Sequence, residues 1–276
     1  MKSTVAPYQT AAWCVRIVCT NGTTVRLTSY PFDLTMSNAT VYKTDSGYEA
    51  SAFSSSSSMA PGAIDIEGIA GVAGISRDQV ASGIFDGARV YVFKCNYLSP
   101  VDDYEEVSSG FFGKTTISDD RYKIEGMSLA DALGQSVGKT YKALCSHKFG
   151  DARCQIDLAA VTVTGSLTHV TGQATFRDSS RAEVADYFGA GTITFTSGAN
   201  LGLKPLEIKS YAADGTITTH EPPYYLPSVG DTYSMIAGCR KRKDDCATKW
   251  NNVTNAFAFW DIPTETAYTL IGGLTQ

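Results

Sequence analysis

Four of the seven cysteines form two closely spaced pairs in the second half of the chain. Eight residues separate Cys145 from Cys154 in CSHKFGDARC, and six separate Cys239 from Cys246 in GCRKRKDDC. Thiolates are the usual protein ligands of structural zinc and of iron–sulfur clusters, and two pairs that each close a short loop suit a set of four ligands. The spacing therefore predicts a metal site, with unconnected buried thiols and disulfides as the alternatives.

The residues around these pairs favour two tight loops. Gly150-Asp151 allows the chain to reverse inside the first pair, and Gly238 allows close backbone approach just before Cys239. Closing the 84 residues between the pairs costs about 4 kcal/mol of chain entropy. A structural zinc ion contributes about 10–16 kcal/mol in small peptides, so a metal could offset that closure. Cations that would stabilise four thiolates crowd both loops: Lys148, Arg153, Arg240, Lys241 and Arg242.

The spacing does not by itself identify the metal. Neither pair has the compact C-x2-C arrangement of zinc ribbons, and zinc and an iron–sulfur cluster both remain compatible with the sequence. His147 lies inside the first cysteine loop and is an alternative ligand, whereas we expect His169 and His220 at the surface.

Constellations that could support catalysis are sparse. Cys145 and His147 are the nearest thiol–base pair, but the expected metal site already uses Cys145. The sequence has no G-x-G-x-x-G after a strand and no P-loop. Three acidic pairs are typical of solvated loops rather than of glycosidase carboxylates: Asp102-Asp103, Glu105-Glu106 and Asp119-Asp120. We therefore predict no catalytic residues, no enzymatic activity, and a metal that holds the fold together.

Charge and hydropathy exclude several classes of protein. The net charge of −5 and the pI near 5.2 argue against specific nucleic-acid binding, because phosphate contact requires a cationic face. No run of eighteen apolar residues could span a membrane, and the N-terminal residues lack the apolar core of a secretory signal. We thus expect folding in a reducing cytoplasm, where Cys14, Cys19 and Cys95 pack as core thiols.

The elements that must position the cysteines are predicted to be mainly β. Asn21-Gly22 and Asp214-Gly215 each separate two alternating apolar runs and predict hairpins. Residues 88–95 (ARVYVFKC) are apolar on both faces and predict a strand covered on each side. Flexibility or ordering on assembly is expected for the serine-rich stretch 51–58.

A few short helices complete the predicted fold. Capping patterns place them at residues 76–83, 128–138 and 180–189, each ended by a glycine. The best boundary falls after the second of these helices. We therefore expect two β-rich domains, one at residues 1–139 and a second at 140–276 that is clasped by a four-cysteine metal cluster.

Several segments in the same order resemble the tail hub, or tail-tip, family of long-tailed phages and gene transfer agents, related to the tail-tip protein L of lambda-like phages. They are SGIFDGARVYVF (82–93), CSHKFGDARCQIDL (145–158), GCRKRKDDC (238–246) and WNNVTNAFAFWDIP (250–263). The resemblance covers most of the chain and is weakest over residues 157–230. At the end of the last segment, Ala258 to Asp261 replace the small residues usual in the family, which affects the expected local backbone but not the upstream cysteines.

The resemblance implies that Cys145, Cys154, Cys239 and Cys246 hold an iron–sulfur cluster, most simply [4Fe–4S]. It also implies a homotrimer in the virion tail tip, assembled in the host cytoplasm. There it would join the tail tube and the distal tail protein to the central tip or fibre protein, with the C-terminus of the tape-measure protein as a further partner. The alternative from another class is a zinc-stapled carbohydrate-binding or hydrolytic tail module.

Overall fold

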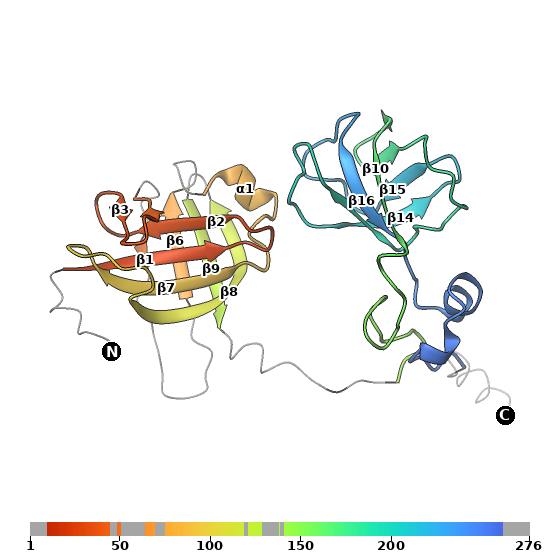
Figure 1. Ribbon diagram of the computed structural model, residues 1–276, viewed down its shortest axis with the longest axis horizontal. Coiled ribbons are helices and arrows are strands. Elements are labelled where there is room, and N and C mark those ends of the chain that lie inside the picture. The colour runs from red at the N-terminus through yellow and green to blue at the C-terminus, as the bar shows by residue number, and fades with distance from the viewer. Residues whose placement is uncertain are drawn as a thin grey trace, which may run out of the picture. The chain divides into compact units, whose positions relative to one another are not determined.

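Figure 1 shows the computed structural model of the chain, which divides into two compact units, Met1–Ser136 and Val137–Gln276. The structure describes residues 10–44, 49–50, 64–69, 75–118, 121–128, 138 and 141–261. Within these residues strands predominate and the helices are few and short, so the predicted mainly β class is confirmed. None of the helices in the described part of the chain has the length and apolarity needed to cross a membrane.

The first unit is built on a seven-stranded antiparallel sheet in the order β2-β1-β7-β8-β9-β6-β5. Its strands are β1 (Ala11–Val18), β2 (Thr24–Thr28), β5 (Glu49–Ala50), β6 (Ile64–Ile69), β7 (Arg89–Asn96), β8 (Glu105–Ser118) and β9 (Arg121–Ser128). A small hairpin of β3 (Leu34–Thr35) and β4 (Val41–Tyr42) leads into Lys43, which bridges to Leu27 of β2. That bridge extends hydrogen bonding at the β2 edge of the sheet.

The predicted elements of this unit are largely present. Gly22 has a φ of +88° in the β1–β2 turn, where the side chain of Asn21 accepts a hydrogen bond from the N–H of Thr23 at 2.9 Å. The capping box is formed, and it begins helix α1 (Arg77–Ala81) with reciprocal bonds between Ser76 and Gln79. Both predictions are confirmed.

Strand β7 is buried on both faces, as its sequence predicts. Val90 and Val92 pack in one apolar cluster, whereas Phe93 and Cys95 pack in a second cluster on the other side. Cys14 and Cys19 are also buried, which confirms that the three N-terminal cysteines are core residues.

The second unit contains a seven-stranded sheet in the order β10-β16-β13-β14-β15-β12-β11. The strands are β10 (Thr162–Ser166), β11 (His169–Val170), β12 (Thr175–Arg177), β13 (Thr192–Phe195), β14 (Leu206–Tyr211), β15 (Thr216–Thr219) and β16 (Thr232–Ile236). The two strands at the ends of this order, β10 and β11, are consecutive in sequence with only Leu167 and Thr168 between them. The N–H of Leu167 bonds to the carbonyl of Asp231 beside β16, and the N–H of Thr168 bonds to the carbonyl of Arg177 in β12. One bent strand thus pairs with both ends of the sheet and closes it into a barrel.

The barrel encloses a core of aromatic and aliphatic side chains. Phe176, Phe188, Tyr233 and Met235 are fully buried within it. Gly215 has a φ of +82° in the β14–β15 turn, which confirms the hairpin predicted at Asp214-Gly215.

Both cysteine pairs lie outside the barrel strands but within the same unit. The first pair precedes β10, and the second follows β16 and leads into a π-helical turn, η1 (Asp245–Lys249), and a 3₁₀ turn, η2 (Val253–Asn255). We call residues 141–161 and 238–261 together the cysteine module. In Figure 1 these green and blue segments run side by side below the barrel.

The helix predicted at residues 180–189 is wrong, because the structure has turns there. The hydroxyl and the N–H of Ser180 bond back to the carboxylate of Asp178 at 2.6 and 2.9 Å. The N–H of Asp186 bonds to the carbonyl of Tyr211 in β14 at 2.7 Å. These tertiary and turn bonds replace the helical ones. The helix predicted at 128–138 and the serine-rich stretch 51–58 lie outside the described residues, apart from positions 128 and 138.

Candidate metal centre

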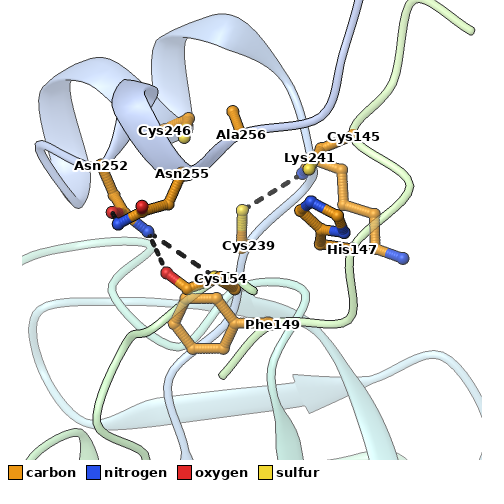
Figure 2. Close-up of a pocket in the computed structure, with 10 residues that line it drawn as sticks. All are labelled: Cys145, His147, Phe149, Cys154, Cys239, Lys241, Cys246, Asn252, Asn255 and Ala256. Atoms are coloured by element: carbon orange, nitrogen blue, oxygen red, sulfur yellow. Dashed lines mark hydrogen bonds between the residues drawn. The ribbon is translucent and has the colours of Figure 1, made fainter. Parts of the chain in front are cut away.

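All four cysteines of the two pairs line one pocket in the cysteine module (Figure 2). The pocket holds about 320 Å³ of space, including its open mouth. His147, Phe149, Lys241 and three residues after η1 complete its wall: Asn252, Asn255 and Ala256. The structure thus brings together two pairs that 84 residues separate in the sequence.

The first cysteine loop is a turn organised by one carboxylate. Asp151 accepts hydrogen bonds from the backbone N–H groups of Cys154 at 2.7 Å, Arg153 at 3.0 Å and Lys148 at 3.1 Å. These donors, led by the N–H of Cys154, lower the pKa of Asp151. Gly150 has a φ of +74°, and a Cβ there would lie 2.3 Å from the side chain of Leu158, so the predicted need for glycine is confirmed.

The second cysteine loop is closed in a similar way. The carboxylate of Asp245 accepts the N–H of Arg240 at 2.6 Å, and the N–H of Cys246 bonds to the carbonyl of Arg242 at 3.1 Å. Gly238 passes so close to the 189–191 backbone that an added Cβ would lie 2.0 Å from the nitrogen of Gly191. The close approach predicted at Gly238 is therefore confirmed, and it fixes where the loop leaves the barrel.

Backbone and amide contacts join the two loops. The N–H of Cys145 donates to the carbonyl of Lys241 at 3.0 Å. The side chain of Asn252 donates to the carbonyl of Cys154 at 2.6 Å. Because these bonds connect residues about 100 positions apart, they place the cysteines of both pairs around the same space.

Two N–H groups also point at cysteine sulfurs. The backbone N–H of Lys241 lies 3.3 Å from Sγ of Cys239, and the side-chain amide of Asn252 lies 3.7 Å from Sγ of Cys154. Donors to sulfur stabilise a thiolate and tune the metal that it binds.

All four thiols are unbridged, so no disulfide competes for them. Burial raises the pKa of Cys239, and the nearby Asp245, Cys154 and Cys145 add to the shift. Burial likewise raises the pKa of Cys246, and the nearby Cys239, Cys145 and Cys154 raise it further. The other thiols thus help to raise the pKa of Cys239 and of Cys246, and a bound cation would have the opposite effect.

The four thiols are ligands of the type that binds either zinc or an iron–sulfur cluster. Within the described residues, no group of three or more His, Cys, Asp or Glu side chains lies close enough together to hold one metal ion. With Zn–S bonds of about 2.3 Å, four thiolates around zinc would lie about 3.8 Å from one another. The described residues thus bring the four cysteines to one pocket without a formed ligand set for a metal ion.

A buried nitrogen in the pocket wall would suit a polar occupant of the pocket. Nδ1 of His147 is buried and has no hydrogen-bond partner, although the His147 ring packs beside Phe257. A buried polar atom without a partner costs about 1–3 kcal/mol. A polar group in the pocket would relieve that cost.

The cations predicted near the cysteines do not share one role. Arg240 forms a two-pronged ion pair with Asp186 of the barrel, including an Nη2–Oδ1 distance of 2.6 Å. Lys241 lines the pocket, whereas Arg242 is exposed. The sequence did not indicate a role for Asn252, Asp245 or Lys249. Asn252 lies within WNNVTNAFAFWDIP, one of the segments that carry the family resemblance. That position was the one signal that could have pointed to Asn252.

The fold and the site define a β-rich protein with two units and a thiol-lined pocket in the second. The family model of baseplate hub proteins, N-terminal attachment domain, matches residues 4–157, and a model described as phage conserved hypothetical protein BR0599 matches residues 186–266. Because the first match covers more than half of the chain, the chain belongs to the baseplate hub protein family. It is a structural protein of a phage-like tail baseplate and not an enzyme.

One solved structure has the same fold over almost the whole chain. It is described as "Virion of native gene transfer agent (GTA) particle", and the alignment covers 94% of this chain and 90% of that chain with a TM-score of 0.84 and 24% identity. No curated protein matches the chain. The resemblance to tail hub proteins that the sequence motifs indicated is confirmed.

Proposed function

We propose that this chain is the hub of a tail tip and that a [4Fe–4S] cluster, held by Cys145, Cys154, Cys239 and Cys246, staples its second unit. The observation that carries the cluster is the single pocket that these four cysteines line. When bound, the cluster would supply four strong metal–sulfur bonds between segments distant in sequence.

The residues around the pocket suit a structural role for the cluster. Four cysteines are available as ligands, so no iron would need an open coordination position. Asn252 and the N–H of Lys241 would stabilise the thiolates, and His147 offers a further polar group. Two of these groups thus contact a proposed ligand sulfur, and the third lines the same pocket.

A zinc-stapled carbohydrate-binding or hydrolytic module is the weaker alternative. Neither cysteine pair has the compact C-x2-C spacing of zinc ribbons.

In the proposed assembly a homotrimer joins the tail tube and the distal tail protein to the central tip or fibre protein. The C-terminus of the tape-measure protein is a further proposed partner. The family match to an attachment domain over residues 4–157 supports this role, because a hub must bind several neighbours at once. The fold shared with a chain of a gene transfer agent particle supports the same kind of assembly.

Reconstruction of the intact particle tests the hub assignment. We expect three copies in a ring, with the tail tube on one side and the tip protein on the other. Another copy number, or a location away from the axis of the tail tip, would contradict this assignment.

Replacing one cysteine tests whether the proposed cluster stabilises the second unit. Cys239→Ser should destabilise the second unit and block completion of tails. Cys19→Ser is the matched control, because Cys19 is buried in the first unit and remote in sequence from the pocket. Normal infectious particles from the Cys239→Ser variant would contradict the structural role.

A further inference from the structure

We propose that Asp151 and Asp245 are positioning residues that build the thiol pocket from protein contacts alone, so that both cysteine loops hold their shape before any inorganic core binds. In many small metal-binding domains the metal and the fold form together, and the protein without metal is unfolded. The contacts in this cysteine module indicate a different order of events. The inference concerns the pocket of the proposed cluster but depends only on the protein.

Asp151 uses both carboxylate oxygens to fix the first loop. Oδ1 accepts the N–H groups of Arg153 and Cys154, and Oδ2 accepts the N–H of Lys148. The backbone of Asp151 adds two bonds, from its N–H to the carbonyl of Lys148 at 3.1 Å and from the N–H of Gln155 to its carbonyl at 2.9 Å. Five bonds thus hold this turn, and a cysteine sulfur takes part in none of them.

Asp245 fixes the second loop by connecting its two ends. It directly precedes Cys246, and its carboxylate accepts the N–H of Arg240, which directly follows Cys239. One side chain therefore connects the two ends of the loop that separates the cysteines. Hydrogen bonds that involve a charged group are about twice as strong as neutral ones, so each aspartate stabilises its turn more than an amide would.

The two fixed turns are then joined without the sulfurs. The N–H of Cys145 bonds to the carbonyl of Lys241, the N–H of Asn252 bonds to the carbonyl of Cys246 at 2.8 Å, and the Asn252 side chain bonds to the carbonyl of Cys154. These bonds bring together residues near 145, 154, 241, 246 and 252. The pocket follows from them, so the loops need not be assembled by the metal.

Hydrogen exchange in cluster-free protein tests this order. The full chain is prepared without iron, and exchange of the backbone N–H groups of Cys154 and Arg240 is followed by NMR. We expect these two amides to exchange at least tenfold more slowly than in an unfolded chain. Exchange at the unfolded rate, with the barrel strands still protected, would overturn the inference.

Variants of the two aspartates identify the groups responsible. Asp151→Ala should remove the protection at Cys154, and Asp245→Ala should remove it at Arg240, while amides of β13 and β16 remain protected. Asp245→Asn should restore part of the protection, because its carbonyl still accepts a hydrogen bond. Asp244→Ala is the control, since Asp244 is exposed and adjacent to Asp245. If the amides of Cys154 and Arg240 stay protected from exchange in both alanine variants, other contacts hold the turns. That result would overturn the role of the aspartates.

A second measurement tests whether the aspartates position the cysteine ligands. On anaerobic addition of ferric iron, sulfide and a thiol reductant that supplies two electrons per cluster, Asp151→Ala and Asp245→Ala should form the visible chromophore at least tenfold more slowly than Asp244→Ala. An equal rate would count against positioning. Should even the unaltered chain bind no iron, the proposed function would fail, whereas protected amides at Cys154 and Arg240 would still support the preformed pocket.

Discussion

The guanidinium of Arg240 donates two hydrogen bonds to the carboxylate of Asp186. This ion pair connects the residue that follows Cys239 to the barrel. Arg240 lowers the pKa of Asp186, as expected for a carboxylate paired with a cation. Asp186 has a φ of +64°, a conformation that Asn also tolerates. The pair therefore fixes the start of the second cysteine loop relative to the barrel.

We expect the Asp186→Asn and Arg240→Gln substitutions to be coupled. Both side chains are partly exposed, so the coupling free energy should be modest, about 0.5–1 kcal/mol in a double-mutant cycle of chemical unfolding. Arg242→Gln is the control, because Arg242 is exposed. Additive effects of the two substitutions would show that the ion pair does not anchor the loop.

Lys249 provides a second anchor, and its loss should be more damaging. Its ammonium donates to the carbonyl of Gly238 at 2.9 Å and to that of Asp186 at 3.1 Å. Burial lowers the pKa of this lysine. Lys249→Met would remove a charged donor from two carbonyls, each of which keeps one neutral donor: Trp250 Nε1 bonds to Gly238 at 3.3 Å and the N–H of Gly189 bonds to Asp186 at 3.1 Å. Because hydrogen bonds from a charged group are the stronger ones, we expect a loss of about 1–3 kcal/mol in the free energy of unfolding of the second unit. Lys243→Met, at an exposed position, should change it by less than about 0.5 kcal/mol.

The barrel should lose stability in acid through Asp178. This buried carboxylate accepts hydrogen bonds from the hydroxyls of Tyr233 and Ser180, both at 2.6 Å. Burial alone would raise its pKa, but these donors and Arg181 outweigh burial and lower it. Because the folded-state pKa lies below the unfolded value near 3.8, the contribution is present above that pH and is lost as the pH falls through the lower folded value.

Asp178→Asn should therefore destabilise the barrel by about 1–3 kcal/mol at neutral pH and flatten the acid limb of its stability curve. Thermal unfolding between neutral pH and pH 2 measures both effects. Tyr233→Phe removes one donor and should reduce the acid dependence in the same direction. An acid limb with the same slope in Asp178→Asn would contradict the assignment.

His147 should affect the loaded and the cluster-free protein in opposite directions. His147→Phe removes a buried nitrogen that lacks a partner and retains a ring that can pack against Phe257. In cluster-free protein this change should be neutral or stabilising by up to about 1 kcal/mol. With the cluster bound it should be destabilising, because the wall of the occupied pocket loses a polar atom. Thermal unfolding of both forms tests the sign, and His169→Phe is the exposed control; the same sign in both forms would contradict the role of His147.

The sequence predicted those features that depend on local chemistry. Gly22 and Gly215 mark hairpins because their turns require a positive φ, and Gly150 and Gly238 lie where a side chain would collide. The cysteine pairs were found from their spacing and their turn residues. The structure adds that all four line one pocket.

Features that depend on tertiary contacts were not predictable. The Ser180–Glu183 pattern resembles a helix start, yet the carboxylate of Glu183 accepts a bond from the hydroxyl of Tyr211, which is distant in sequence. In the same way, nothing near Asn252 in sequence indicates that its amide will reach Cys154. Such contacts depend on closure of the barrel and on meeting of the two loops.

The most direct test of the central claim is the amount of iron and acid-labile sulfide in anaerobically purified protein. The account predicts about four of each per chain, with broad visible absorbance, and it predicts loss of both in Cys239→Ser but not in Cys19→Ser. One zinc ion per chain without sulfide, or iron content unchanged by Cys239→Ser, would contradict it.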